Sequence, residues 1–187
     1  MKTIIAMLVT LSVIGIVSGG GLAMVSSWAD PLIAKNKQAE TERAIFLVQP
    51  QGKSYEAVAD AKIVIYRVFD ENKQPIGYSL PWVGNGFQGK VVIMIGLKTD
   101  LKSLTSIEIL EQVETPGLGT KIMEDPFRKQ FDALPVDPQV DWVKGAPPTK
   151  PNEIQTITGA TISSKAVVAI VNDGLVKARA ALGGSSK

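Results

Sequence analysis

The stretch KVVIMIGL, residues 90–97, is an almost unbroken run of aliphatic side chains and predicts a buried strand. A similar run, KIVIYRVFD, precedes it at residues 62–70, and SIEILEQV follows at residues 106–113 with partial alternation of apolar and polar side chains. Glycines recur in residues 84–89, directly before the central run, and indicate a turn there. We expect the three runs to form a central, mainly antiparallel sheet.

Helices are predicted on both sides of a proline-rich spacer. Asp125-Pro126 is typical of the start of a short helix, which would turn Phe127 and Phe131 to one side. Residues 135–151 carry five prolines that favour turns and extended chain. Residues 161–182 have helical character, with a break or kink expected at Asn172-Asp173-Gly174. Helices packed against a mainly antiparallel sheet define an α+β fold.

The composition excludes several classes of chemistry. The 187 residues are 45% apolar and 20% charged, as in one folded domain, and 20 basic against 18 acidic residues give a net charge of +2, which predicts no nucleic-acid partner. The chain has no cysteine and no histidine. It therefore cannot form a disulfide, a cysteine-ligated iron–sulfur cluster, a usual structural zinc site or a Ser-His-Asp group. We expect no metal site, and only carboxylate, lysine or tyrosine chemistry, or a borrowed organic cofactor, remains.

The N-terminal region is predicted to cross a membrane. No charged residue occurs between Thr3 and Ala29, and residues 4–25 are almost entirely apolar. As a helix this run of 22 residues would span about 33 Å, against a hydrocarbon core of about 30 Å. We expect an anchor over residues 1–29 with Trp28 at the membrane interface. A cleaved signal peptide is the alternative, because small residues follow the run.

A helical stalk and linker are expected over residues 30–60, where Asp30-Pro31 is typical of a helix N-cap followed by a proline in the first turn. The tail ahead of the apolar run is very short, and such tails usually stay in the cytoplasm. We therefore expect a single-pass protein of the inner (cytoplasmic) membrane, with residues 30–187 on the extracytoplasmic side.

Hydroxyl side chains gather where the last helix is predicted to begin, in QTITGATISSK at residues 155–165. The first turn of a helix has unpaired N–H groups and a partial positive charge, and so can bind a phosphate. Gly159 and Ala160 leave room for a large anion, and Lys165 lies one turn after Thr161, where its ammonium group could neutralise the phosphate. A plain N-cap is the alternative interpretation.

A second loop, ETPGLGTK at residues 114–121, follows the third predicted strand. Its proline and two glycines favour a tight turn whose N–H groups can point inward, and Thr115 and Thr120 add hydroxyl groups. An ordinary connection between a strand and a helix is the alternative. The two loops together are more specific than either alone.

Residues 158–161 (TGAT) resemble the S/T-G-A-T flavinylation motif, and residues 114–119 (ETPGLG) resemble the companion motif of the FMN-binding domain in the G subunits of Rnf electron-transport complexes. The C subunit of the sodium-translocating NADH:quinone reductase is a close relative of that family. The resemblance implies covalent FMN, which a separate magnesium-dependent flavin transferase takes from FAD and joins through its phosphate to Thr161. Gln155 stands where the family commonly has an acidic residue, a departure that bears on the efficiency of modification.

The resemblance also implies the residues of the FMN site. Thr115, Leu118 and Gly119 would approach the isoalloxazine or ribityl group, and Lys165 is our addition from helix geometry. Whether Trp82, Phe87 or Trp142 packs on the ring stays open at this stage. The residues expected around the phosphate on Thr161 are Thr158, Gly159, Ala160, Ser163 and Ser164.

The function implied is that of a covalently flavinylated electron-relay protein, in a membrane Rnf-type complex that couples ferredoxin oxidation and NAD reduction to Na⁺ or H⁺ translocation. Such a relay would have no catalytic residue of its own. Its partners would be the other membrane and iron–sulfur subunits of the complex, and the flavin transferase during maturation. The FMN-binding domain is expected over residues 61–182, with a flexible tail at residues 183–187. The alternatives are the C subunit of an NADH:quinone reductase and an anchored, non-redox module that binds a phosphate-bearing ligand.

Overall fold

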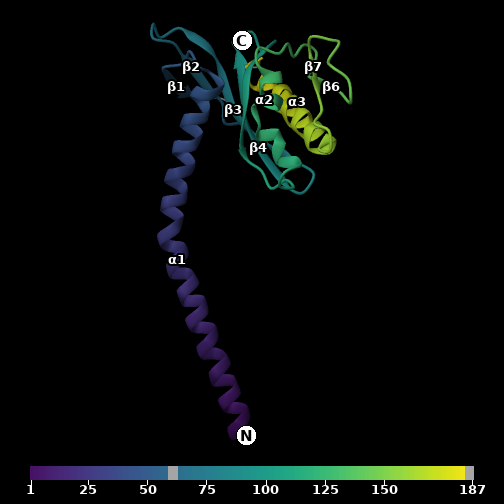
Figure 1. Ribbon diagram of the computed structural model, residues 1–187. Coiled ribbons are helices and arrows are strands. Elements are labelled where there is room, and N and C mark those ends of the chain that lie inside the picture. Colours follow the sequence, from purple (N-terminus) through teal and green to yellow (C-terminus); the bar gives the residue numbers. More distant parts are fainter. Residues whose placement is uncertain (59–62, 184–187) are drawn as a thin grey trace. The chain divides into compact units, whose positions relative to one another are not determined.

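The computed structural model describes residues 1–58 and 63–183, which form two compact units, Met1–Glu40 and Thr41–Lys187. The order of the elements along the chain is shown in Figure 1. The predicted domain boundary at residue 61, the start of the first predicted strand at residue 62 and residues 184–187 of the predicted tail lie outside the described residues.

The first helix, α1, runs without interruption over Lys2–Val48. It is long and apolar enough to cross a membrane, and none of the residues in its most apolar window is buried. The prediction that a separate helix begins at Asp30-Pro31 was wrong. Asp30 accepts a hydrogen bond from the Ser26 hydroxyl one turn earlier (3.2 Å), and Pro31 lies inside the helix.

The sheet of the second unit has five antiparallel strands in the order β1-β2-β3-β4-β5. This confirms the predicted α+β class with a mainly antiparallel sheet. The three predicted runs correspond to β2, β4 and β5, whereas β1 and β3 were missed. The bounds are β1 Ser54–Ala57, β2 Tyr66–Phe69, β3 Pro75–Asn85, β4 Lys90–Lys98 and β5 Leu104–Glu111.

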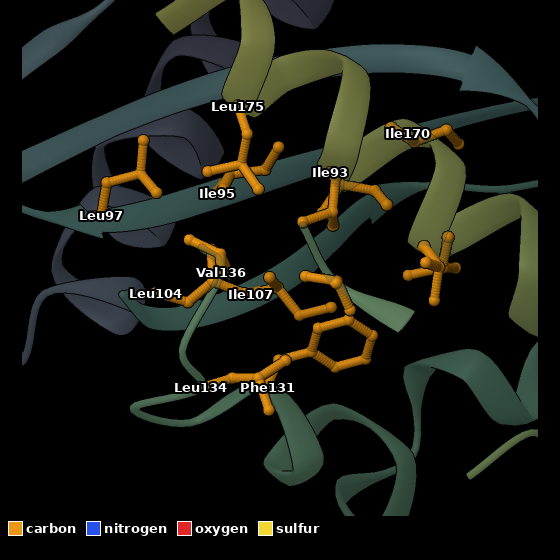
Figure 2. Packing of buried hydrophobic residues seen from close by; sticks show 14 of the residues in the cluster. Ile93, Ile95, Leu97, Leu104, Ile107, Phe131, Leu134, Val136, Ile170 and Leu175 are labelled. Carbon is orange, nitrogen blue, oxygen red and sulfur yellow. The ribbon is translucent and has the colours of Figure 1, made fainter. Parts of the chain in front are cut away.

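Strand β4 is apolar throughout because both faces of the sheet are covered. Ile93 and Ile95 belong to the larger core, where they face Ile170 and Leu175 of the last helix (Figure 2). Met94, between them in sequence, packs in a smaller core with Ala44, Ile45 and Val48 at the end of α1, and with Val68. Alternate residues of one strand thus enter two different cores, which accounts for the continuous apolar run.

The last helix, α3 (Thr161–Gly183), is continuous through residues 172–174, so the predicted break was wrong. Gly174 is needed for packing, because a Cβ there would lie 2.7 Å from Ile95 Cδ1 and 3.2 Å from Trp82 Cγ. Asn172 and Asp173 bond other segments through their side chains. These residues therefore fit a helix that crosses the sheet closely.

Short elements connect β5 to α3. They are a 3₁₀ turn at Gly119–Met123, the helix α2 at Asp125–Arg128 and a second 3₁₀ turn at Lys129–Phe131. Phe127 and Phe131 are buried edge to face, as their spacing predicted. The proline-rich stretch that follows contains two short parallel strands, β6 (Asp141–Val143) and β7 (Glu153–Gln155).

Candidate functional site

The two loops singled out in the sequence lie together around one cavity of about 580 Å³ in the second unit. The loop after β5, the turn between β3 and β4, the loop after β6 and the start of α3 supply its walls. The predicted site residues that line it are Thr115, Leu118, Gly119, Thr158, Gly159, Ala160, Thr161 and Ser163. Phe87, Lys144, Gly145, Thr156 and Ile162 also line it.

Thr161 is the first residue of α3, and its side chain is half-buried at the cavity. The chain reaches it through Gly159, whose φ of +86° lies in the left-handed region that favours glycine. A Cβ at Gly159 would lie 3.4 Å from Leu118 Cδ2, an ordinary contact distance, so the positive φ rather than a lack of space favours glycine here. The Thr161 hydroxyl therefore stands at a helix N-terminus, where backbone N–H groups favour an anion.

Ser163 and Ser164 are adjacent, but their hydroxyls have different partners. The Ser164 hydroxyl donates to the Ala160 carbonyl (2.9 Å) and accepts from the Ile157 N–H (3.0 Å), which closes the start of α3. Its side chain is fully buried and is not part of the cavity wall as the described residues define it. The Ser163 hydroxyl donates to the buried Glu114 carboxylate.

Lys165 is not among the residues that line the cavity. Its ammonium group is 3.8 Å from the centre of the Trp142 ring, in a cation–π contact between α3 and β6. Lys144, in the loop after β6, lines the cavity and is the cation there among the described residues. Lys144 was missed because no motif in the sequence connects that loop to the helix start.

Among the three aromatic residues left open, Phe87 lines the cavity and its side chain is 58% exposed. The Trp82 indole N–H donates to Asp173 (2.8 Å), and Trp142 is in contact with Lys165. Phe87 lies in the glycine-rich turn between β3 and β4, which the sequence marked as a turn without indicating where its side chains would point.

Glu114 does not line the cavity, but its side chain bonds residues of two cavity walls. Its carboxylate is buried and accepts hydrogen bonds from the Phe87 N–H (2.7 Å), the Gln88 N–H (3.2 Å) and the Ser163 hydroxyl. No pattern in the sequence indicates this role, because the donors are 26 to 49 residues away.

Gln155 lies beside the cavity wall rather than in it. Its backbone N–H donates to the Gln130 side chain (2.7 Å), which in turn donates to the Gln155 carbonyl (3.2 Å). Next to it, Thr156 lines the cavity and is buried, with no hydrogen-bond partner for its hydroxyl among the described residues. Gln155, Thr156 and Thr158 also line a smaller neighbouring cavity of about 300 Å³.

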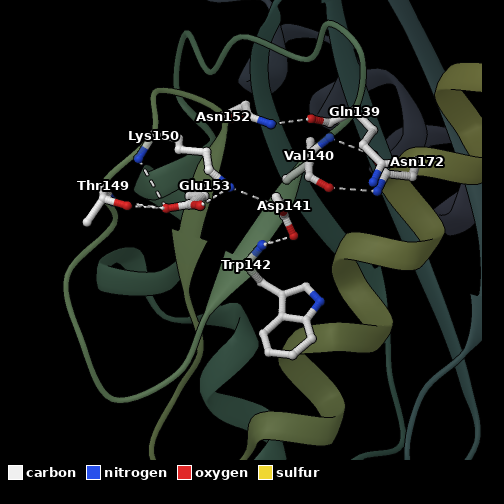
Figure 3. A network of polar contacts seen from close by, with 9 residues as sticks. All are labelled: Gln139, Val140, Asp141, Trp142, Thr149, Lys150, Asn152, Glu153 and Asn172. Atoms are coloured by element: carbon white, nitrogen blue, oxygen red, sulfur yellow. Dashed lines mark hydrogen bonds and ion pairs between the residues drawn. The ribbon is translucent and has the colours of Figure 1, made fainter.

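The loop that carries Lys144 is closed at its other end by Glu153 (Figure 3). This carboxylate accepts hydrogen bonds from the Thr149 N–H (2.9 Å) and the Lys150 N–H (3.1 Å), and it pairs with the Lys150 ammonium (3.0 Å). The Thr149 N–H and the Lys150 groups lower the pKa of Glu153 from 4.5 to about 2. The same pairing raises the pKa of Lys150, with a smaller contribution from Asp141.

The residues of the cavity suit a ligand with an anionic end and an apolar, planar end. Hydroxyls of Thr158 and Thr161, the N-terminus of α3 and the Lys144 ammonium suit a phosphate. Phe87, Leu118 and Ile162 present apolar side chains that are 58%, 48% and 58% exposed, as a flavin ring would require. These polar and apolar walls together fit FMN.

Residues 1–58 and 63–183 contain no group of three acidic, cysteine or histidine side chains placed to hold a metal.

Comparison with known proteins gives the class first. The sequence profile of the FMN-binding domain family matches residues 86–176, which include the Phe87 turn, both loops and most of α3. A solved structure of the C subunit of a Na⁺-translocating NADH-quinone reductase from Parabacteroides distasonis has the same fold. Its TM-score is 0.63 at 18% identity, over 83% of this chain and 97% of that chain.

Two relatives then define the particular family. The G subunit of the proton-translocating ferredoxin:NAD⁺ oxidoreductase complex of Clostridium ljungdahlii is 31% identical over 184 residues, covering 98% of this chain and 96% of that protein. The G subunit of the ion-translocating oxidoreductase complex of Methanosarcina acetivorans is 27% identical over 175 residues, covering 89% and 90%. The chain belongs to the family of Rnf-type G subunits, which confirms the resemblance drawn from the two loops.

Proposed function

We propose that this chain is the electron-transfer subunit of an ion-translocating ferredoxin:NAD⁺ oxidoreductase complex, and that it carries FMN as a phosphoester of Thr161. Family membership and the match to the FMN-binding domain support the relay role and the flavin. The observation that carries the covalent link is the position of Thr161, whose half-buried side chain lies at the start of α3 on a cavity shared with the ETPGLG loop.

Each wall has a separate task in this arrangement. Thr161 holds the phosphoryl group covalently, the first turn of α3 and the Thr158 hydroxyl bind its oxygens, and Lys144 neutralises its charge. Phe87, Leu118 and Ile162 cover the flavin ring and exclude water from part of it. FMN supplies the one- and two-electron chemistry that a chain without cysteine and histidine lacks.

Loading requires a separate, magnesium-dependent flavin transferase with FAD as the donor. The Thr161 hydroxyl oxygen forms a bond to the phosphorus of the FMN half, the bond between the two phosphoryl groups breaks, AMP leaves and the hydroxyl proton is released. Thr161 suits this role because its side chain is only half-buried, whereas Ser163 and Ser164 are buried. An ester would retain the flavin where free FMN is scarce.

The relay has no substrate pocket of its own in this proposal, and its partners are the other membrane and iron–sulfur subunits of the complex. Helix α1 supports association with the membrane. We also place the FMN domain on the extracytoplasmic side of the inner membrane, a placement that the labelling of a single introduced cysteine tests directly. Purification of the complex with an iron–sulfur protein that docks ferredoxin supports this assignment, and a quinone-reducing set of partners contradicts it.

The absence of cysteine allows a direct test of sidedness. Val176 on α3 is 61% exposed and does not line the cavity as the described residues define it. A Val176→Cys chain in intact cells should react with a membrane-impermeant maleimide. Labelling only after the cells are lysed would contradict the extracytoplasmic placement.

The ester is tested by co-expressing the full chain with a flavin transferase and denaturing the purified protein. The wild type should show flavin fluorescence that migrates with the polypeptide in a denaturing gel. Thr161→Ala should abolish it, whereas the matched variant Thr158→Ala should retain it, because only Thr161 forms the ester. A dark wild-type band would favour an anchored module that binds a free phosphate-bearing ligand, and a fluorescent Thr161→Ala band would place the ester elsewhere.

A further inference from the structure

The Glu114 side chain connects three of the segments that form the cavity. Oε1 accepts the Phe87 and Gln88 N–H groups from the turn between β3 and β4, and Oε2 accepts the Ser163 hydroxyl from the first turn of α3. Glu114 itself begins the loop after β5, and the Gln88 side chain bonds Thr115 next to it (2.8 Å). One buried side chain thus connects segments that lie far apart in the sequence.

The backbone around this carboxylate is shaped to admit it. A Cβ at Gly86 would overlap Glu114 Oε1, and a Cβ at Gly119 would lie 2.7 Å from Glu114 Cβ and 2.8 Å from Oε2. Side chains at either position would displace the carboxylate or the turn. The two glycines therefore serve the close approach of Glu114, in addition to any approach of a ligand to the loop.

The hydrogen bonds also decide what Ser163 can do. A serine hydroxyl has one proton, and that of Ser163 is donated to Glu114. Toward any other group, its oxygen can only accept. Ser163 therefore cannot donate to a phosphate on Thr161 while this bond is in place, although it lines the cavity.

We infer that Glu114 is a positioning residue for the FMN site, acting through Phe87 and through the first turn of α3. Oε1 holds the turn that places the Phe87 ring on the cavity, and Oε2 holds the helix turn two residues after Thr161. This inference rests on the proposed function for its ligand. The coupling between the walls, however, belongs to the chain alone.

The coupling is tested on the flavin-free full chain in detergent, by amide hydrogen exchange of peptides that contain Phe87 and Gln88. Glu114→Ala should exchange these amides about tenfold faster, because both lose their acceptor. Glu114→Gln should retain most of the protection through its amide oxygen. The matched control is Glu71→Ala, which removes an exposed carboxylate paired with Lys53. It should change nothing, and unchanged exchange in Glu114→Ala would overturn the inference.

The effect on the flavin is tested on loaded chains, by the anisotropy of flavin fluorescence and by the midpoint potential. Glu114→Ala and Phe87→Ala should shift both in the same direction, and the double variant should add little to either, since one residue acts through the other. Fully additive shifts would overturn the inference. If Glu114→Ala does not fold, Glu114→Gln and Ser163→Ala, each of which removes one of the bonds, must give smaller shifts of the same sign. A wild type without flavin would refute the proposed function, while the exchange experiment would still decide the coupling.

Discussion

Two buried glutamates, Glu114 and Glu153, each accept backbone N–H groups, but they organise their surroundings differently. The donors to Glu153 are Thr149 and Lys150, four and three residues away, so this carboxylate closes one loop of the β6–β7 region (Figure 3). The donors to Glu114 lie 26 to 49 residues away, in the other walls of the cavity. The side chain of Glu153 therefore stabilises one loop, whereas that of Glu114 connects separate walls of the cavity.

The difference between the two glutamates predicts how far from the substituted residue the structure should loosen. Loss of Glu153 should loosen the loop that carries Lys144 and leave the core unchanged, because its bonds do not cross to the sheet. Loss of Glu114 should reach the turn before β4 and the start of α3 together.

The largest effect is expected for Glu114→Ala. Two backbone N–H groups and a hydroxyl would lose their acceptor in the interior, which should lower the free energy of unfolding by about 3 kcal/mol. Urea unfolding followed by circular dichroism measures this change. A loss below about 1 kcal/mol would mean that Glu114 is no more important than an ordinary hydrogen-bonding side chain.

A smaller loss is expected for Asn172→Ala, which tests the long-range tie of the β6–β7 region. The Asn172 amide donates to the Val140 carbonyl and accepts its N–H, both at 2.9 Å. Removing both bonds should lower the free energy of unfolding by about 1–2 kcal/mol. Protease cleavage should increase between residues 141 and 152 and not in the ETPGLG loop. Equal cleavage of both loops would contradict the contrast.

Titration of Glu153 should have a modest effect with a defined sign. The pKa of this carboxyl is lowered to about 2 in the folded chain from 4.5, so its contribution to stability is fully present above about pH 4.5. That contribution is lost as the pH falls from about 4.5 towards about 2. Urea midpoints measured at about pH 5 and about pH 3 check this prediction. Between these two pH values, the wild type should lose more stability than the Glu153→Gln variant. An equal loss would show that Glu153 does not contribute.

The smallest effect is expected for Lys165→Gln, which removes the cation over Trp142. Trp142 is 36% exposed, and a cation–π contact at such a site stabilises by about 0.5–1 kcal/mol. Covalent flavin loading should stay at the wild-type level, because Lys165 does not line the cavity. In the matched variant Lys144→Gln, the flavin potential should shift. The opposite result would restore Lys165 as the cation of the site.

The fold could be predicted where a pattern in the sequence, such as an apolar run or a helical spacing, directly reflects burial. Residues 90–97 form a strand whose two faces are both covered, and Phe127 and Phe131 share a face because of their helical spacing. Strand β3 was missed because its Pro75, Pro81 and glycines are typical of turns. Its pairing with β4 along nine positions overrides those propensities.

The candidate site could be predicted only as far as its two motifs reach. The TGAT turn and the ETPGLG loop are visible in the sequence and line one cavity. Lys144, the role of Glu114 and the choice of Phe87 among three aromatic residues could not be predicted, because they depend on contacts between segments distant in the sequence. The position of Lys165 shows the same limit: one helical turn from Thr161 was correct as spacing, but Trp142 on another element holds its ammonium group.

The most direct test of the covalent flavin is the mass of the peptide that contains Thr161, taken from protein produced in its native cells. We expect this peptide to be heavier by one esterified FMN, and fragmentation to place the added mass on Thr161 rather than on Thr158, Ser163 or Ser164. An unmodified peptide, or FMN attached to another residue, would contradict the proposed linkage.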